Sequence, residues 1–246
     1  HGDLWVDTSL SVHTLKQYSS DIEGWVEIED KFIRITCNGI GINFKEFDGV
    51  TLSGFNSIGA DGTHIIYHKG EDFIVIAGML DRNVTIKTPF TVERKLPSLD
   101  FVCESGNRLW GCSSETNEIF ASKLGDPTNF FAYMGISTDS YAATVGTDGE
   151  FTGAVSYRGY VLFFKENCVH KVYGNYPANF QIQDTACRGV QKGCHGSLAI
   201  VNETLFYKSR GGICAFDGSL PVEASYALGS EIYSDAVGGA INNKYY

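Results

Sequence analysis

The sequence repeats one pattern of short apolar stretches and turns at least three times. In each copy, three strand-like stretches are separated by turn-forming pairs. Their first stretches are Phe101 to Glu104, Gly153 to Tyr157 and Ser197 to Val201, and the copies close at Pro127, Pro177 and Pro221. The copies follow one another every 40 to 55 residues. This is the length of a small antiparallel sheet rather than of a helical repeat.

The later stretches of each copy favour β-strands. They are Arg108 to Trp110, Tyr160 to Phe164 and Leu205 to Tyr207, then Glu118 to Ser122, Cys168 to Tyr173 and Ile213 to Phe216. β-branched and aromatic residues suit a pleated surface, and pairs such as Gly106-Asn107 and Arg158-Gly159 form turns. Leu109, Leu162 and Leu205 are expected in equivalent surroundings.

A single sheet of this size leaves its faces and edges bare, so it needs neighbours. Radial stacking covers the faces. The repeat therefore predicts an all-β protein with a β-propeller of about four or five blades, or part of a larger propeller. A β-sandwich is the alternative, but it does not predict an in-register triplicate.

The sequence as a whole predicts three parts of the chain. Residues 1–23 are predicted as a first partial propeller blade, 24–95 as an inserted small β domain resembling a barrel, and 96–246 as propeller blades, the last one incomplete. Residues 237–246 look like a new copy that stops in its second stretch. The chain lacks an initiator Met, which indicates a piece of a longer protein, and the two partial units could pair to close a ring.

The inserted domain is predicted from several short strands. They are Trp25 to Ile28, Phe32 to Ile35, Val50 to Gly54, His64 to Tyr67 and Phe73 to Ile76. Alternation of Thr51 and Ser53 with apolar neighbours is typical of a strand with one wet face.

Charge and cysteine content narrow the class of protein. A net charge of −10 argues against a general binder of nucleic acid, which needs a basic stripe, and the longest apolar run, around 73–80, is too short for a membrane span. Seven cysteines without C-x-x-C spacing argue against a zinc site and a disulfide framework. A reducing cytoplasm is the simplest origin, and Cys187 and Cys194 are the one pair to test for a bridge.

Two regions resemble proteins of tailed bacteriophages. Phe47 to Gly54, with the strand-like stretches at 62–66 and 72–76, resembles a small β domain of phage tail proteins. Asn107 to Cys112, Ile119 to Phe130 and Ser209 to Gly218 resemble the propeller repeats of phage and prophage virion proteins. The resemblance implies a structural protein of the tail, the tail tip or the head-to-tail junction.

Motifs for catalysis or metal binding are missing from the sequence. It holds no H-E-x-x-H, P-loop, G-x-S-x-G or EF-hand pattern, and we predict no catalytic, cofactor-binding or metal-binding residue. His64 and His68 share a strand face about 13 Å apart, too far for one metal ion. A glycoside hydrolase would use carboxylates about 5 to 10 Å apart, for which Glu104, Asp139 and Glu150 are the candidates.

Aromatic residues leave a glycan-binding or host-recognition propeller open as an alternative function. The candidates for stacking on sugars are Trp5, Trp25, Trp110, Tyr245 and Tyr246. Large aromatics in strands also fill the space between blades, and this packing role is the stronger explanation for Trp110.

The function expected from the sequence is assembly. We expect a non-enzymatic virion protein, assembled in the bacterial host cytoplasm, whose partners are other virion subunits, including copies of itself. No sequence-specific nucleic acid, no membrane and no cofactor is expected. The loops 113–117 and 175–178 are predicted to dock neighbours, and the segment 135–150 is predicted to contact a partner or to serve as a plain connection.

Overall fold

A computed structural model describes residues 4–7, 14–19, 24–78, 84–87, 89–228 and 233–246, with side chains from Phe32 onward. The chain divides into two compact units, His1–Leu96 and Pro97–Tyr246. Strands and short 3-10 turns make up the regular structure of the described residues, which contain no α-helix. The prediction of an all-β protein is confirmed. The described part also contains no helix long and apolar enough to cross a membrane.

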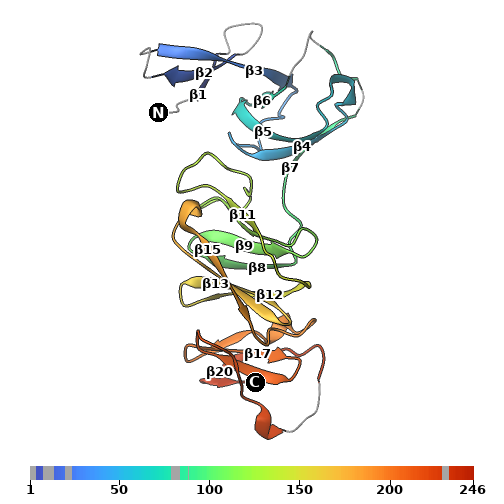
Figure 1. The fold of residues 1–246 in the computed structure, drawn as a ribbon. Helices are drawn as coiled ribbons and strands as arrows, with labels where there is room; N and C mark the ends of the chain where they lie inside the picture. Colours follow the sequence, from blue (N-terminus) through green and yellow to red (C-terminus); the bar gives the residue numbers. More distant parts are fainter. Residues whose placement is uncertain (1–3, 8–13, 20–23, 79–83, 88, 229–232) are drawn as a thin grey trace. The chain divides into compact units, whose positions relative to one another are not determined.

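The first unit is one seven-stranded sheet in the order β1-β2-β3-β6-β5-β4-β7 (Figure 1). Its strands are β1 (Leu4–Asp7), β2 (Thr14–Ser19), β3 (Gly24–Thr36), β4 (Gly49–Ser53), β5 (Gly62–Lys69), β6 (Phe73–Ala77) and β7 (Thr91–Arg94). The two stretches predicted at 25–28 and 32–35 form one strand, β3. It pairs with β2 through its first half and with β6 through its second half.

β4 shows the alternation predicted from its sequence, because Val50 and Leu52 are buried and Thr51 and Ser53 are exposed. The buried side chains join Ile66, Ile74 and Ile76 in the core of this unit. Residues 1–96 form one unit in which β2 pairs with β3. The separation of 1–23 as a propeller blade from 24–95 as an inserted domain therefore stays a prediction.

The second unit contains three four-stranded antiparallel sheets in succession. The first holds β8 (Phe101–Ser105), β9 (Arg108–Ser113), β10 (Glu118–Ala121) and β11 (Tyr141–Thr144). The second holds β12 (Phe151–Tyr157), β13 (Tyr160–Lys165), β14 (Cys168–Tyr173) and β15 (Gln181–Ala186). The third holds β16 (Ala199–Val201), β17 (Thr204–Ser209), β18 (Gly212–Phe216) and β19 (Val222–Glu223).

The first three strands of every sheet lie where the repeat predicts them. Leu109, Leu162 and Leu205 all lie in second strands, β9, β13 and β17. Leu109 and Leu205 are the second residues of their strands, whereas Leu162 is the third and Val161 takes the matching place. Leu162 and Leu205 are buried in the same core, whereas Leu109 is only half-buried and belongs to none of the cores of the described residues, so the expected equivalence of their surroundings holds for two of the three. The copies are equivalent in strand order, with a shift of one residue in the middle copy.

The turn between the first two strands has the same backbone in every copy. Both of its residues have positive φ: 61° and 59° at Gly106 and Asn107, 49° and 84° at Arg158 and Gly159, and 45° and 66° at Asn202 and Glu203. Two successive residues with positive φ define the hairpin turn whose twist matches that of the strands. The sequence predicted the first two of these turns.

The fourth strand of each sheet was not predicted. β11, β15 and β19 follow the proline that marks the end of each predicted copy. They are edge strands; β11 alternates half-buried and exposed residues, and four of the six residues of β15 are exposed. An edge strand with one wet side carries a weak apolar pattern, which explains the omission.

Neighbouring sheets bury their facing sides against each other. Trp110, Ile119, Phe151 and Phe163 belong to one core between the first and second sheets. The core between the second and third sheets includes Tyr157, Leu162, Phe164, Leu205 and Tyr207. Tyr157 also donates a hydrogen bond of 2.5 Å from its hydroxyl to the carbonyl of Glu203. Each sheet thus covers a face of the next.

A further hairpin covers part of the third sheet. It consists of β20 (Ala240–Ile241) and β21 (Lys244–Tyr245), joined by a turn at Asn242 and Asn243. The Tyr245 ring stacks on Phe206 at 5.3 Å, and its hydroxyl donates to the carbonyl of Ser197. The hairpin therefore packs on the third sheet, in the segment that the sequence predicted as the start of a new copy.

The seven cysteines are all free thiols. Cys194 is buried, and its sulfur accepts a hydrogen bond from the backbone N–H of Ala236. Cys187 is half-buried at the second sheet. Burial raises the pKa of the Cys187 thiol to about 11 and that of Cys103 to about 12. These thiols pack as small apolar groups.

Candidate docking surface

The connection between β10 and β11 is the longest in the three sheets and folds into a compact loop. Asp139, only 4% exposed, organises it: Oδ2 accepts hydrogen bonds from the N–H groups of Met134, Gly135 and Ile136, at 2.6 to 3.1 Å. A carboxylate that accepts several backbone N–H bonds fixes the path of the chain. The candidate carboxylate Asp139 is thus a structural residue of this loop.

Arg108 fastens the same loop to the first sheet. Its guanidinium donates to the carbonyls of Ser122 at 2.7 Å, Asp139 at 2.5 Å and Ser137 at 2.9 Å, and its side chain is buried. Burial lowers the pKa of Arg108, and the nearby Asp139 carboxylate opposes that shift. One buried cation thus replaces water for three carbonyl groups that would otherwise be unpaired.

A cavity of about 470 Å³ lies between this loop and the turn after β14. Its wall is mainly apolar and aromatic, and it contains Tyr133, Ile136, Tyr141, Tyr176 and Pro177. Tyr133 is 50% exposed and Ile136 is 55% exposed. Burial raises the pKa of Tyr133, and the nearby Glu118 carboxylate raises it further. The cavity joins two of the segments that the sequence predicted as contact regions, 135–150 and 175–178.

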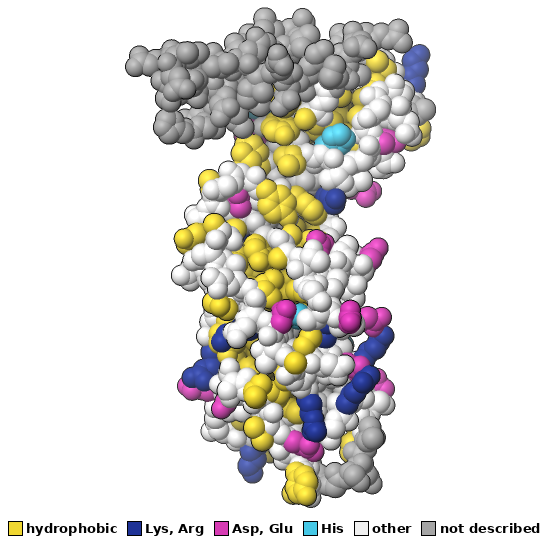
Figure 2. All heavy atoms as spheres, in the orientation of Figure 1, with side chains coloured by type: hydrophobic (Ala, Val, Ile, Leu, Met, Phe, Trp, Pro, Cys, Tyr) yellow, Lys and Arg dark blue, Asp and Glu magenta, His cyan; other side chains and the backbone are white. Residues whose placement is uncertain are grey.

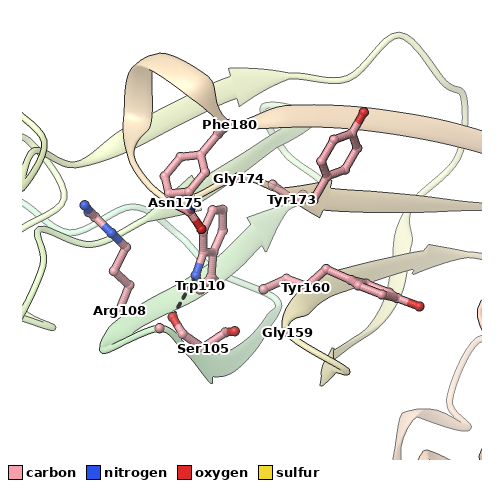
Figure 3. Close-up of a pocket in the computed structure, with 12 residues that line it drawn as sticks. Ser105, Arg108, Trp110, Gly159, Tyr160, Tyr173, Gly174, Asn175 and Phe180 are labelled. Atoms are coloured by element: carbon pink, nitrogen blue, oxygen red, sulfur yellow. Dashed lines mark hydrogen bonds between the residues drawn. The ribbon is translucent and has the colours of Figure 1, made fainter.

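A smaller hollow of about 210 Å³ is lined by residues of the first and second sheets and of the turn after β14 (Figure 3). Trp110 and Phe180 contact edge to face at 5.0 Å, and the Trp110 N–H donates to the carbonyl of Ser105. Tyr160 and Tyr173 also line it, and in Figure 3 their rings point away from Trp110. The hollow thus combines aromatic rings with the polar residues Ser105, Arg108 and Asn175.

The third predicted loop, 113–117, is engaged within the unit. The Ser114 hydroxyl accepts a hydrogen bond from the N–H of Phe151, and the Asn117 side chain donates to the carbonyls of Val145 and Thr147. These bonds join the first sheet to the start of the second. The loop therefore contributes to the sheet junction, and its docking role stays a prediction.

The three carboxylates considered for glycan hydrolysis lie in different local settings. Glu104 accepts a hydrogen bond from the N–H of Asn107 in its own hairpin, and Glu150 forms an exposed ion pair with Lys192. Asp139 holds the loop described above. None of the hydrogen bonds and ion pairs of the described residues joins any two of the three.

The aromatic candidates for glycan binding also lie in different surroundings. Trp110 is 4% exposed and belongs to the core between two sheets. Tyr245 packs on Phe206, and Tyr246 is 65% exposed. The side chains of Trp5 and Trp25 lie outside the described residues.

Histidines 64 and 68 have separate partners. His64 contacts the carbonyl of Ala60 at 2.9 Å, and His68 contacts Glu46 at 2.6 Å. Within the described residues, no group of three His, Cys, Asp or Glu side chains is arranged to hold a metal ion.

A buried polar network at the junction of the first two sheets was not anticipated. The His170 ring, fully buried, contacts Asp184 at 2.5 Å through Nδ1 and the Thr147 hydroxyl at 2.9 Å through Nε2. The Lys165 ammonium donates to Asn117 at 2.6 Å and to the Thr147 carbonyl at 2.7 Å. The network fixes the chain before β12. Its members are far apart in sequence, so no local motif reveals it.

The comparisons with known proteins give no family for this chain. No model of a known protein family matches the sequence, and no curated protein is significantly similar to it.

Proposed function

We propose that this chain is a non-enzymatic structural protein of a tailed bacteriophage or prophage particle, and that its second unit is part of a β-propeller. The observation that supports this most is the succession of equivalent four-stranded sheets, each covering a face of the next. Propellers are built from such sheets arranged around an axis. The likeness of residues 107–112 and 119–130 to phage propeller repeats supplies the virion context.

The sheet junctions suit a rigid scaffold. Burying a large apolar side chain stabilises a fold by about 1.5–3 kcal/mol, and Phe164 and Phe163 are fully buried at successive junctions. Ion pairs add contacts between the second and third sheets, with Arg188 and Glu223 at 2.7 Å and Arg210 and Glu166 at 2.5 Å. These exposed pairs contribute less than the apolar cores.

Assembly also needs surfaces that remain available to partners, which we take to be other virion subunits, including copies of this chain. The cavity at 133–142 and 176–178 presents apolar side chains at the surface. Exposed apolar patches of this kind mark interaction sites. The particle would be assembled in the cytoplasm of the bacterial host.

The decisive experiment is to purify particles by density gradient from the phage or lysogen that carries the gene, and to identify their proteins by mass spectrometry. We expect this chain in the particles at a fixed ratio to a tail protein. Its presence in the lysate together with its absence from the particles would overturn the proposal. Electron microscopy of the full-length protein should show a ring of blades.

A glycan-binding propeller is the second candidate, favoured by the hollow that Trp110, Tyr160, Tyr173 and Phe180 line (Figure 3). Aromatic rings beside polar groups suit the faces and hydroxyls of a sugar. A glycan array tests this candidate, and a Tyr173→Ala variant should lose any binding that the hollow provides.

A further inference from the structure

The three sheets of the second unit differ in how their outer edges are protected. β15 carries Asp184, which is exposed and bound to His170, and β19 has only two residues, one of them the ion-paired Glu223. Charged side chains and short strands are the means by which proteins keep sheet edges from pairing. β11, with the sequence Tyr-Ala-Ala-Thr, has four residues and no charge. Its edge is therefore the least protected of the three.

The backbone of β11 offers hydrogen-bonding groups on its outer side. The N–H of Val145 donates to the carbonyl of Asn117 on the β10 side. Because inward and outward residues alternate along an antiparallel ladder, the backbone groups of Ala142 and Thr144 point away from β10. β11 ends its sheet, and no other described strand pairs with this edge. An added strand could therefore form backbone hydrogen bonds with Ala142 and Thr144.

The apolar cavity adjoins this edge. Tyr141 and Ala142 of β11 line it together with Tyr133, Ile136 and Tyr176. A strand that pairs with an edge places alternate side chains on one face of the sheet, where pockets select them. An apolar side chain of an added strand could therefore enter the cavity.

Charge indicates which kind of segment fits. Residues 97–150 hold eight acidic residues against two basic ones, a net charge of −6, whereas residues 151–246 hold eight basic and seven acidic ones. Arg108, one of the two basic residues, is occupied by backbone carbonyls. Glu118 lies opposite Thr144 in the ladder. The surroundings of the edge attract positive charge.

We propose that the outer edge of β11 binds an extended, basic segment of a neighbouring protein subunit, which adds a fifth strand to the first sheet and places an apolar side chain in the cavity. The inference rests on the proposed scaffold function, since it names the chemistry of a partner. A nucleic acid is disfavoured by the same acidic charge.

The probe is a fluorescein-labelled seven-residue peptide that alternates lysine with valine, and its counterpart replaces every lysine with glutamate. We expect fluorescence anisotropy to show saturable binding of the basic peptide, weakened by salt, and at least tenfold weaker binding of the acidic one. Bound peptide should slow hydrogen exchange at the amides of Ala142 and Thr144. An equal response to both peptides would overturn the proposal.

Two proline variants locate the site. Ala142→Pro removes an outward N–H, which an edge strand tolerates, and should weaken binding at least tenfold. Ala186→Pro is the matched control, because Ala186 has the same outward orientation at the end of β15: its neighbour Cys187 donates to Asn167 on the β14 side. If Ala142→Pro lowers the melting temperature markedly, Ala142→Lys tests the same edge, because an added positive charge should repel the basic peptide and weaken its binding. Equal losses at 142 and 186 would contradict the assignment.

Sedimentation of the chain without peptide tests for the competing occupant, a second copy. A dimer that Ala142→Pro abolishes, combined with no peptide binding, would overturn the basic segment in favour of self-pairing. Failure of these assays leaves the presence of the chain in purified particles unaffected, so the docking site and the scaffold function are judged by separate results.

Discussion

The first sheet of the second unit and the two sheets after it have the same strand order and different surfaces. The second and third sheets are nearly balanced in charge and are joined by ion pairs such as Arg188 with Glu223. The first sheet carries the acidic excess and the long loop held by Arg108. Acidic and basic side chains are most frequent over the second and third sheets on the face drawn in Figure 2. One repeated sheet thus serves stacking in some copies and, as we propose, docking in another.

The largest effect should come from breaking a sheet junction. Phe164, fully buried between the second and third sheets, lies 5.1 Å from the Tyr207 ring. Phe164→Ala should lower the free energy of unfolding by about 3–5 kcal/mol, because it leaves a cavity. Urea denaturation measures this change. Tyr226→Ala, at a position that is 86% exposed, should change stability by less than about 0.5 kcal/mol. Similar values for the two variants would refute a packed junction.

The loop of the first sheet should respond to the loss of its buried cation. Arg108→Ala leaves the carbonyls of Ser122, Ser137 and Asp139 without a donor, at a cost of about 2 kcal/mol. Hydrogen exchange should accelerate at residues 134–140 more than in the second and third sheets. Arg158→Ala is the control, because that side chain is 51% exposed. Unchanged exchange in the loop would show that Arg108 does not hold it.

The junction between the first two sheets should weaken in acid. Burial lowers the pKa of His170, and this outweighs the contact with Asp184, which raises it. The folded state then binds the proton less readily than the unfolded chain, so stability is highest above about pH 6.5 and falls as the pH drops below it. The fall is at most about 1.4 kcal/mol per pH unit.

The variant His170→Gln removes this titration and should flatten the fall of the unfolding free energy between pH 7.5 and 5.5. Tyr226→Ala should keep the pH dependence of the parent chain. Lys165, whose own pKa burial lowers, acts electrostatically on His170, and Asp184, Cys168 and Thr147 contact the His170 ring. An unaltered pH profile in His170→Gln would assign the dependence to other groups.

The smallest effect concerns thiol reactivity. With the pKa of Cys103 raised to about 12 and that of Cys187 to about 11, few thiolates exist at pH 8. Because the thiolate is the reactive form, both residues should react with iodoacetamide at least about tenfold more slowly in the native chain than in guanidinium chloride. Peptide mapping by mass spectrometry gives the rates. Rapid labelling in the native chain would contradict burial at these positions.

Much of the fold could be predicted because its determinants are local. Glycine and asparagine pairs such as Gly106-Asn107 favour the positive φ values of the hairpin turns, and β-branched and aromatic residues on either side favour strands. The fourth strands escaped prediction because β15, Gln-Ile-Gln-Asp-Thr-Ala, is mostly polar. The candidate site was predicted only in part. The segments 135–150 and 175–178 were predicted as contact regions, but the cavity between them was not predicted.

Neighbouring residues and simple counts were enough to establish the first three strands of each copy, two of the three hairpin turns between first and second strands, the period of the repeat and the acidic excess of residues 97–150. Packing in three dimensions was needed to show that Arg108 holds the loop at 137–139, that His170 contacts Thr147 and Asp184, and that the outer edge of β11, unpaired among the described strands, lies beside a cavity. The contacts of Arg108 with this loop and of His170 with its partners join residues 14 to 31 positions apart, and they form only when the sheets pack.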